Sequence, residues 1–113
     1  MQKVNVNDLK YRDGMSGVKY LFRGPKVDWG VIRLLPGQTL GAHYHERVEE
    51  TFYFTSGAPI MMVNGERIRV RTGDAFRLEP TDKHDIINDT DSAVDITFIK
   101  DRLDPDDKVS IKE

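Results

Sequence analysis

Apolar and polar residues alternate with a period of two along many short segments of this chain, as they do in half-buried β-strands. The alternation is clear in residues 67–71 and 95–98, and residues 50–54 place Glu50, Phe52 and Phe54 on one face. No window of ten or more residues shows the 3.6-residue spacing of an amphipathic helix. Nine glycines and five prolines further disfavour long helices. The sequence therefore predicts an all-β fold.

Turn-forming residues separate these segments at the spacing of short strands. Residues 61–68 predict a β-hairpin, because Asn64-Gly65 supplies the two positive-φ positions of a type I′ turn. Many short strands at even spacing favour a sandwich, a barrel or a jelly roll. The chain ends are expected to hold an edge strand around residues 4–6 and a tail, 104–113, that opens with a solvated turn at 104–107.

Composition limits the function classes that are open to the chain. The 113 residues suffice for a single domain, 1–113, and the absence of cysteine excludes disulfides, thiolate metal sites and cysteine nucleophiles. A net charge of −2 argues against a nucleic-acid partner. No apolar stretch approaches the roughly 20 residues that span a bilayer, and no signal peptide is visible. We therefore expect a cytoplasmic protein without a membrane partner.

The three histidines of the chain fall into one pattern. His43 and His45 are two residues apart, so on a strand both side chains point to the same face, about 6.7 Å apart along the chain. His84 begins the segment 84–88, where it shares a face with the apolar Ile86. All three imidazoles are therefore expected on inward faces, where they can converge on one point.

A carboxylate follows the histidine pair after a turn, and two glutamates compete for that position. Alternation favours Glu50 over Glu49, because Glu50 shares its face with Phe52 and Phe54. Three imidazoles and one carboxylate form a suitable ligand set for one divalent transition metal, namely Mn, Fe, Ni, Zn or Cu. The predicted metal ligands are His43, His45, Glu50 and His84.

The spacing of these residues resembles that of a known family, the cupins. Gly37, followed after five residues by His43-Tyr44-His45, after four more by Glu50 and after six more by Gly57, resembles the first cupin motif at every fixed position. Fifteen residues separate Gly57 from the second block, as in the compact microbial members. The two motifs and their spacer cover residues 37–88.

The second block, residues 73–88, resembles the second cupin motif. Gly73, His84 and Asn88 match that motif in type and register. Glu79 stands where the family has proline, and Thr81 stands where it has glycine. These two departures bear on the shape of a turn, since neither position is a ligand in the family.

The resemblance implies a jelly-roll β-barrel that holds one metal near its open end, with Asn88 at a strand end near the site. Because cupins include dioxygenases, decarboxylases and isomerases, the resemblance implies a metal-dependent enzyme that acts on a small polar or anionic molecule. A non-catalytic module that binds or senses a small molecule or a metal is the alternative. Relatives commonly pair through the N-terminal edge strand, which implies a homodimer.

Other residues are weaker candidates for a substrate pocket. Arg33 interrupts an apolar strand and is expected either to bind a carboxylate or to lie flat on the outer face. A general base is expected from a neighbour of the ligands, such as Glu49 or Tyr53, and no catalytic residue is identified. The expected pocket residues are Arg33, Phe52, Met62 and Phe76.

Overall fold

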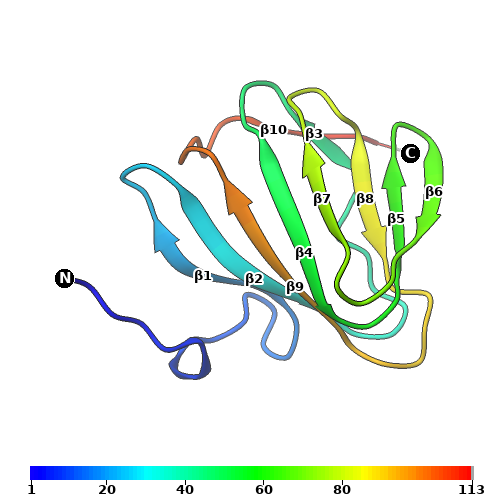
Figure 1. The fold of residues 1–113 in the computed structure, drawn as a ribbon, viewed down its shortest axis with the longest axis horizontal. Coiled ribbons are helices and arrows are strands. Elements are labelled where there is room, and N and C mark those ends of the chain that lie inside the picture. Colours follow the sequence, from blue (N-terminus) through cyan, green and yellow to red (C-terminus); the bar gives the residue numbers. More distant parts are fainter. Residues whose placement is uncertain (113) are drawn as a thin grey trace.

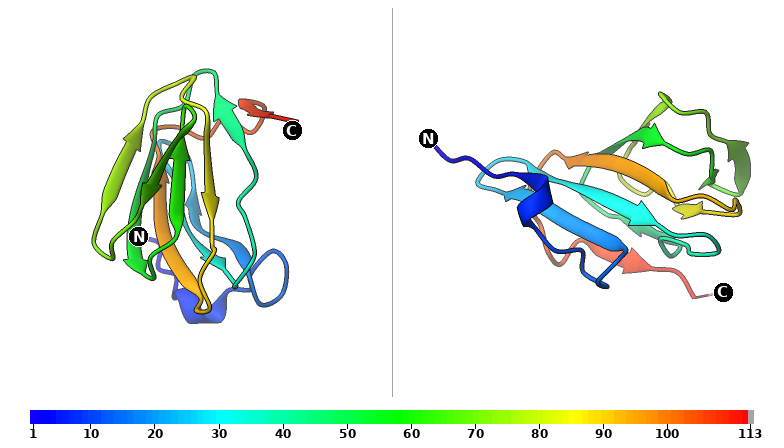
Figure 2. Two further views of the ribbon diagram at one scale, coloured as in Figure 1. Left: turned by 90° about the vertical axis from the view of Figure 1, so that its right-hand side faces the viewer. Right: turned by 90° about the horizontal axis from the view of Figure 1, so that it is seen from below.

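The computed structural model of the chain describes residues 1–112, which form ten β-strands, one short 3₁₀ helix and no α-helix. The strands pair antiparallel into two five-stranded sheets, which face each other as a barrel (Figures 1 and 2). This arrangement confirms the all-β, jelly-roll prediction. No helix among the described residues has the length and apolar character needed to cross a bilayer.

Each sheet combines strands that are distant in the sequence. The first sheet has the spatial order β1 (Gly17–Arg23), β2 (Asp28–Leu34), β9 (Val94–Lys100), β4 (Glu50–Ser56) and β7 (Ala75–Leu78). The second has the order β10 (Lys108–Ser110), β3 (His43–His45), β8 (His84–Ile87), β5 (Ile60–Val63) and β6 (Glu66–Arg69). The strand that precedes a turn therefore often pairs in one sheet while the strand that follows it pairs in the other.

The core fills the space between the two sheets. Alternate residues of β2, β4 and β9 are buried, as the period-two pattern predicted. Phe52, Phe54 and Phe98 are almost fully buried in this core, and Phe76 packs against it from β7. The hairpin predicted at residues 61–68 is also confirmed, since β5 pairs with β6 across the turn.

The two chain ends differ from the sequence prediction. Residues 4–6 form no strand; the 3₁₀ helix η1 (Val6–Asp8) lies there instead, and the side chain of Asn5 caps it by accepting a hydrogen bond from the Asn7 amide at 2.9 Å. Polar residues with short side chains stabilise such local turns and compete with strand pairing. The turn at 104–107 is not fully solvated, because Asp107 at its end is completely buried and β10 then pairs with β3.

One departure from the cupin motif leaves the turn conformation in place. Thr81 has a φ of +74°, in the left-handed region that glycine adopts without strain. Its amide donates a hydrogen bond to the carbonyl of His45 at 2.6 Å, which connects this turn to β3. The backbone conformation expected of a glycine is therefore kept by a β-branched residue, at a cost in local strain.

Candidate metal centre

The three histidines and Glu50 meet inside the barrel near one end. His43 and His45 alternate with Tyr44 on β3, so both imidazoles point inward, and each residue is about 4% exposed. His84, the first residue of β8, lies directly opposite His43 across an antiparallel pair. Glu50 is the first residue of β4 in the other sheet and is also buried. The cluster therefore joins both sheets.

The ligand atoms of these four side chains converge. One nitrogen or oxygen from each lies within 4.8 Å of those from the other three. Nε2 of His45 is 3.1 Å from Oε1 of Glu50, and Nε2 of His84 is 3.7 Å from the same oxygen. The structure therefore brings together all four residues that the sequence placed in one ligand set.

The second ring nitrogen of each histidine faces away from the cluster. Nδ1 of His43 donates to the Gly41 carbonyl at 2.7 Å, and Nδ1 of His84 donates to the Asp82 carbonyl at 2.9 Å. Because a carbonyl can only accept, these contacts place the proton on Nδ1 and leave the lone pair of Nε2 directed at the cluster. The rings are thus oriented as ligands before any ion binds.

The donor set fits a divalent transition metal. Nε2 of His84 is buried and has no hydrogen-bond partner among the described residues. A buried polar atom left unpaired costs free energy, and coordination to a cation would remove that cost. Neutral imidazole nitrogens and one carboxylate oxygen around a single point are ligands of the first-row metals from Mn to Zn. The cluster can hold one such ion.

Two pKa shifts keep the cluster in its ligating protonation state. Burial, and then repulsion from His84, lowers the pKa of His43 to about 3, so this imidazole is neutral at physiological pH. Burial alone would raise the pKa of Glu50, but its contacts with His45 and then His84 outweigh burial and hold that pKa at about 2. A neutral imidazole and an ionised carboxylate are the forms that bind metals.

Asp107 is a buried neighbour of the cluster that sequence reasoning missed. Its carboxylate accepts hydrogen bonds from the amides of Arg47 at 2.9 Å and Val48 at 3.0 Å, and Oδ2 lies 3.6 Å from Nδ1 of His45. The sequence signal was weak, because Asp107 lies in the segment Asp104-Pro105-Asp106-Asp107, which is typical of an exposed turn. Only the pairing of β10 with β3 carries it to His45.

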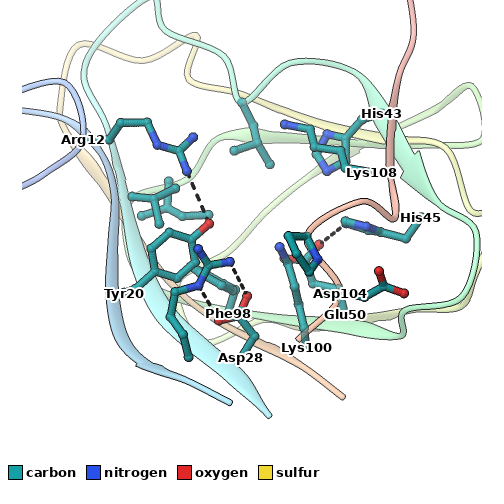
Figure 3. A pocket seen from close by; sticks show the side chains of 15 residues that line it. Arg12, Tyr20, Asp28, His43, His45, Glu50, Phe98, Lys100, Asp104 and Lys108 are labelled. Carbon is teal, nitrogen blue, oxygen red and sulfur yellow. Dashed lines mark hydrogen bonds and ion pairs between the residues drawn. The ribbon is translucent and has the colours of Figure 1, made fainter. Parts of the chain in front are cut away.

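A cavity of about 320 Å³ opens beside the cluster (Figure 3). His43, His45 and Glu50 form part of its wall, and His84 is not among its lining residues. Tyr20 and Phe98 contribute an aromatic side to the cavity, where their rings pack edge to face with centroids 5.8 Å apart. A cavity of this volume accommodates a small molecule in contact with three of the four candidate ligands.

The four residues expected in a substrate pocket lie elsewhere, and none of them lines this cavity. Arg33 is on the outer face of β2, where Nε binds Oδ1 of Asp95 at 2.8 Å, because residues 32 and 34 take the inward positions. Met62 also faces outward, and its sulfur lies 3.8 Å from a guanidinium nitrogen of Arg67. Phe52 and Phe76 belong to the apolar packing between the sheets.

The expected general bases also point away from the cluster. Glu49 lies 3.6 Å from Arg77 on the outer surface, and Tyr53 is 48% exposed. Both have the opposite strand parity to Glu50, so their side chains leave the barrel. The four cationic residues that line the cavity were not identified from the sequence; they are Arg12, Arg23, Lys100 and Lys108. The period-two alternation of β9 would have indicated Lys100, because this residue shares the inward face of the strand with Phe98.

Comparison with known proteins agrees with this architecture. The solved structure of a conserved protein with a double-stranded β-helix domain from Klebsiella pneumoniae superposes with a TM-score of 0.84 at 16% identity, covering 100% of this chain and 99% of that one. A sugar phosphate isomerase from a cupin superfamily of Silicibacter pomeroyi superposes with a TM-score of 0.77 at 18% identity, covering 89% of this chain and 76% of that one. At these identities the likeness concerns the fold.

Sequence comparison gives the family. The chain is 32% identical over 59 residues to the tetracenomycin polyketide synthase protein TcmJ of Streptomyces glaucescens. The match covers 52% of this chain and 40% of that protein. The chain thus matches less than half the length of this curated relative. A model of the cupin domain matches residues 30–100, a segment that contains all four residues of the buried cluster. The chain therefore belongs to the cupin family.

Proposed function

We propose that this cupin is a metal-dependent enzyme that acts on a small polar or anionic molecule. The observation that supports the proposal is the buried cluster of His43, His45, Glu50 and His84 with a cavity of about 320 Å³ beside it. A metal with a purely structural role needs no cavity at its side, whereas a catalytic site must admit a substrate.

In this proposal, different residues bind the metal and enclose the substrate. His43, His45, Glu50 and His84 hold the metal, and when bound the metal supplies Lewis acidity toward a substrate oxygen. The aromatic side of the cavity, formed by Tyr20 and Phe98, shields the bound molecule from water.

The reaction would be of the dioxygenase, decarboxylase or isomerase type. A structural neighbour described as a sugar phosphate isomerase favours isomerisation as the first class to assay. A non-catalytic binding or sensor module is the second candidate, because none of the described residues that line the cavity is a carboxylate free to act as a base.

Metal loading is the first test. Metal-free protein is incubated separately with Mn²⁺, Fe²⁺, Ni²⁺, Zn²⁺ and Cu²⁺, desalted and analysed for metal content. We expect about one ion per chain for at least one of these metals, and loss of that ion in His45→Ala and Glu50→Gln. Glu66→Gln on the surface of β6 is the matched control and should retain the metal. Folded wild-type protein that takes up none of the five metals would contradict the proposal.

Water exchange separates an enzyme from a closed metal site. In Mn²⁺-loaded protein, coordinated water that exchanges with solvent enhances the relaxation of bulk water protons. We expect such enhancement because the cavity reaches the cluster. A loaded protein without any enhancement has no coordination position left for a substrate, and that result would favour a binding or structural role over catalysis.

A further inference from the structure

The cavity beside the cluster carries a surplus of positive charge. Arg12 enters it from the segment before β1, Lys100 from the end of β9 and Lys108 from the start of β10. Arg12 and Lys108 point toward the open space from opposite sides, and Lys100 rises between them (Figure 3). Three separate parts of the chain thus deliver a cation to one small space.

Strand register accounts for the position of two of these cations. Lys100 lies directly opposite Glu50 on β4, and Lys108 lies directly opposite His45 on β3. Residues directly opposite each other in an antiparallel pair share a face of the sheet. Both lysines therefore project to the same side as the cluster.

The carboxylates of the cavity wall are already occupied. Asp28 accepts two hydrogen bonds from Arg23, at 3.1 and 3.2 Å, and Asp104 accepts one from Arg47 at 2.8 Å. Glu50 is held by His45 at 3.1 Å and belongs to the cluster. The acidic side chains of the wall thus have other partners.

The three cations form no ion pair with a carboxylate among the described residues. Within residues 1–112, no carboxylate oxygen lies within 4.0 Å of the charged nitrogens of Arg12, Lys100 or Lys108. The hydrogen bond that Arg12 makes is to the neutral hydroxyl of Tyr20, at 3.3 Å. Three like charges therefore face one small space, and a bound anion would relieve their mutual repulsion.

We propose that the cavity binds a small molecule through an anionic oxygen-bearing group, a carboxylate or a phosphate, which Arg12, Lys100 and Lys108 hold beside the cluster. That this molecule is a substrate rests on the proposed function; the anion site itself requires no metal. Among the described residues that line the cavity, these three side chains are the basic ones that make no ion pair with a carboxylate, whereas Arg23 is paired with Asp28.

The test uses metal-free protein, so that an anion cannot bind through the metal. Acetate and inorganic phosphate are titrated into ¹⁵N-labelled protein at constant ionic strength, and amide shifts are followed by NMR. Acetamide, which has the shape of acetate without its charge, is the ligand control. We expect saturable shifts around the cavity with acetate or phosphate and none with acetamide, and the tighter ligand identifies the group that the site prefers.

Variants locate the binding group. Lys108→Gln and Arg12→Gln should each weaken binding about tenfold, which is the effect of losing one charged hydrogen bond, whereas Lys108→Arg should retain most of it. Lys3→Gln removes the same charge from the exposed N-terminal segment and should have no effect. Equal weakening by Lys3→Gln and Lys108→Gln, or binding of acetamide as tight as that of acetate, would overturn the inference.

The outcomes also separate this inference from the proposed function. If the protein binds no metal but binds anions in a Lys108-dependent manner, the anion site stands and the metal-dependent enzyme is wrong. If anions bind only to the metal-loaded protein, with no change in Lys108→Gln and Arg12→Gln, the cations are not an anion site and the inference is overturned, while the metal centre stands.

Discussion

The carboxylate of Asp107 lies 3.6 Å from Nδ1 of His45, on the side of the ring opposite the contact between Nε2 and Glu50. His45 is thus placed between two buried carboxylates. Asp107 is itself held by the amides of Arg47 and Val48, so its position is set by the backbone. A negative charge behind a ligating imidazole raises the basicity of its other nitrogen.

We expect Asp107→Asn to lower metal affinity by about 10- to 100-fold, because the substitution removes the buried negative charge that lies 3.6 Å from Nδ1 of His45. Affinity is measured by competition with a chromophoric chelator, and thermal unfolding of the metal-free variant is recorded in parallel. Asp106→Asn, at the exposed neighbouring position, is the control. If both variants bind metal equally well, or if Asp107→Asn changes only the unfolding temperature, then Asp107 stabilises the fold without positioning His45.

The metal-free protein should lose stability as the pH falls below neutrality. His43 has an ordinary pKa of 6.5 and a pKa of about 3 in the folded protein, so between these values the unfolded chain binds a proton that the folded chain does not. The free energy of unfolding should therefore fall by up to about 1.4 kcal/mol per pH unit in this window.

The lowered pKa of Glu50 acts in the same direction, from pH 4.5 down to about 2, because protonation of the unfolded carboxyl is favoured there. Urea unfolding at successive pH values measures both effects. His43→Asn should flatten the dependence above pH 4.5. A stability that stays constant between pH 7 and pH 4 in the wild-type protein would show that His43 is not buried in its neutral form.

Thr81→Gly should raise the free energy of unfolding by about 1 kcal/mol, because the φ of +74° strains a β-branched residue and not a glycine. Chemical denaturation of both proteins measures the difference. Thr72→Gly is the control. Thr72 does not have a positive φ, and its hydroxyl donates a hydrogen bond to the Gly57 carbonyl at 3.0 Å. This substitution should therefore lower the free energy of unfolding. A lower free energy of unfolding in Thr81→Gly would contradict the interpretation that Thr81 is strained.

The homodimer remains a prediction. β1 is an edge strand of its sheet, and an uncovered edge offers unpaired backbone groups to a second chain. Size-exclusion chromatography with light scattering should give twice the 13.0 kDa of one chain at micromolar concentration. If the measured mass stays that of one chain as the protein concentration is raised, the homodimer prediction is wrong.

The sequence by itself determined the fold class and the membership of the cluster. Period-two alternation depends only on neighbours along one strand, so the inward faces of β4 and β9 and the choice of Glu50 over Glu49 followed from parity. The same rule placed His43 and His45 on one face. The spacing of the two cupin motifs then joined His84 to them.

Tertiary structure alone decided which residues surround the cluster. Asp107 and Lys108 reach His45 only because β10 pairs with β3, and pairing between strands some 60 residues apart leaves no periodic signal in either segment. The sequence left Arg33 open between the cavity and the outer face for a related reason: its strand parity was not anchored to a known inward residue. Local alternation tells which residues share a face, but the contact between faces depends on register, and register is set by the packing of the whole barrel.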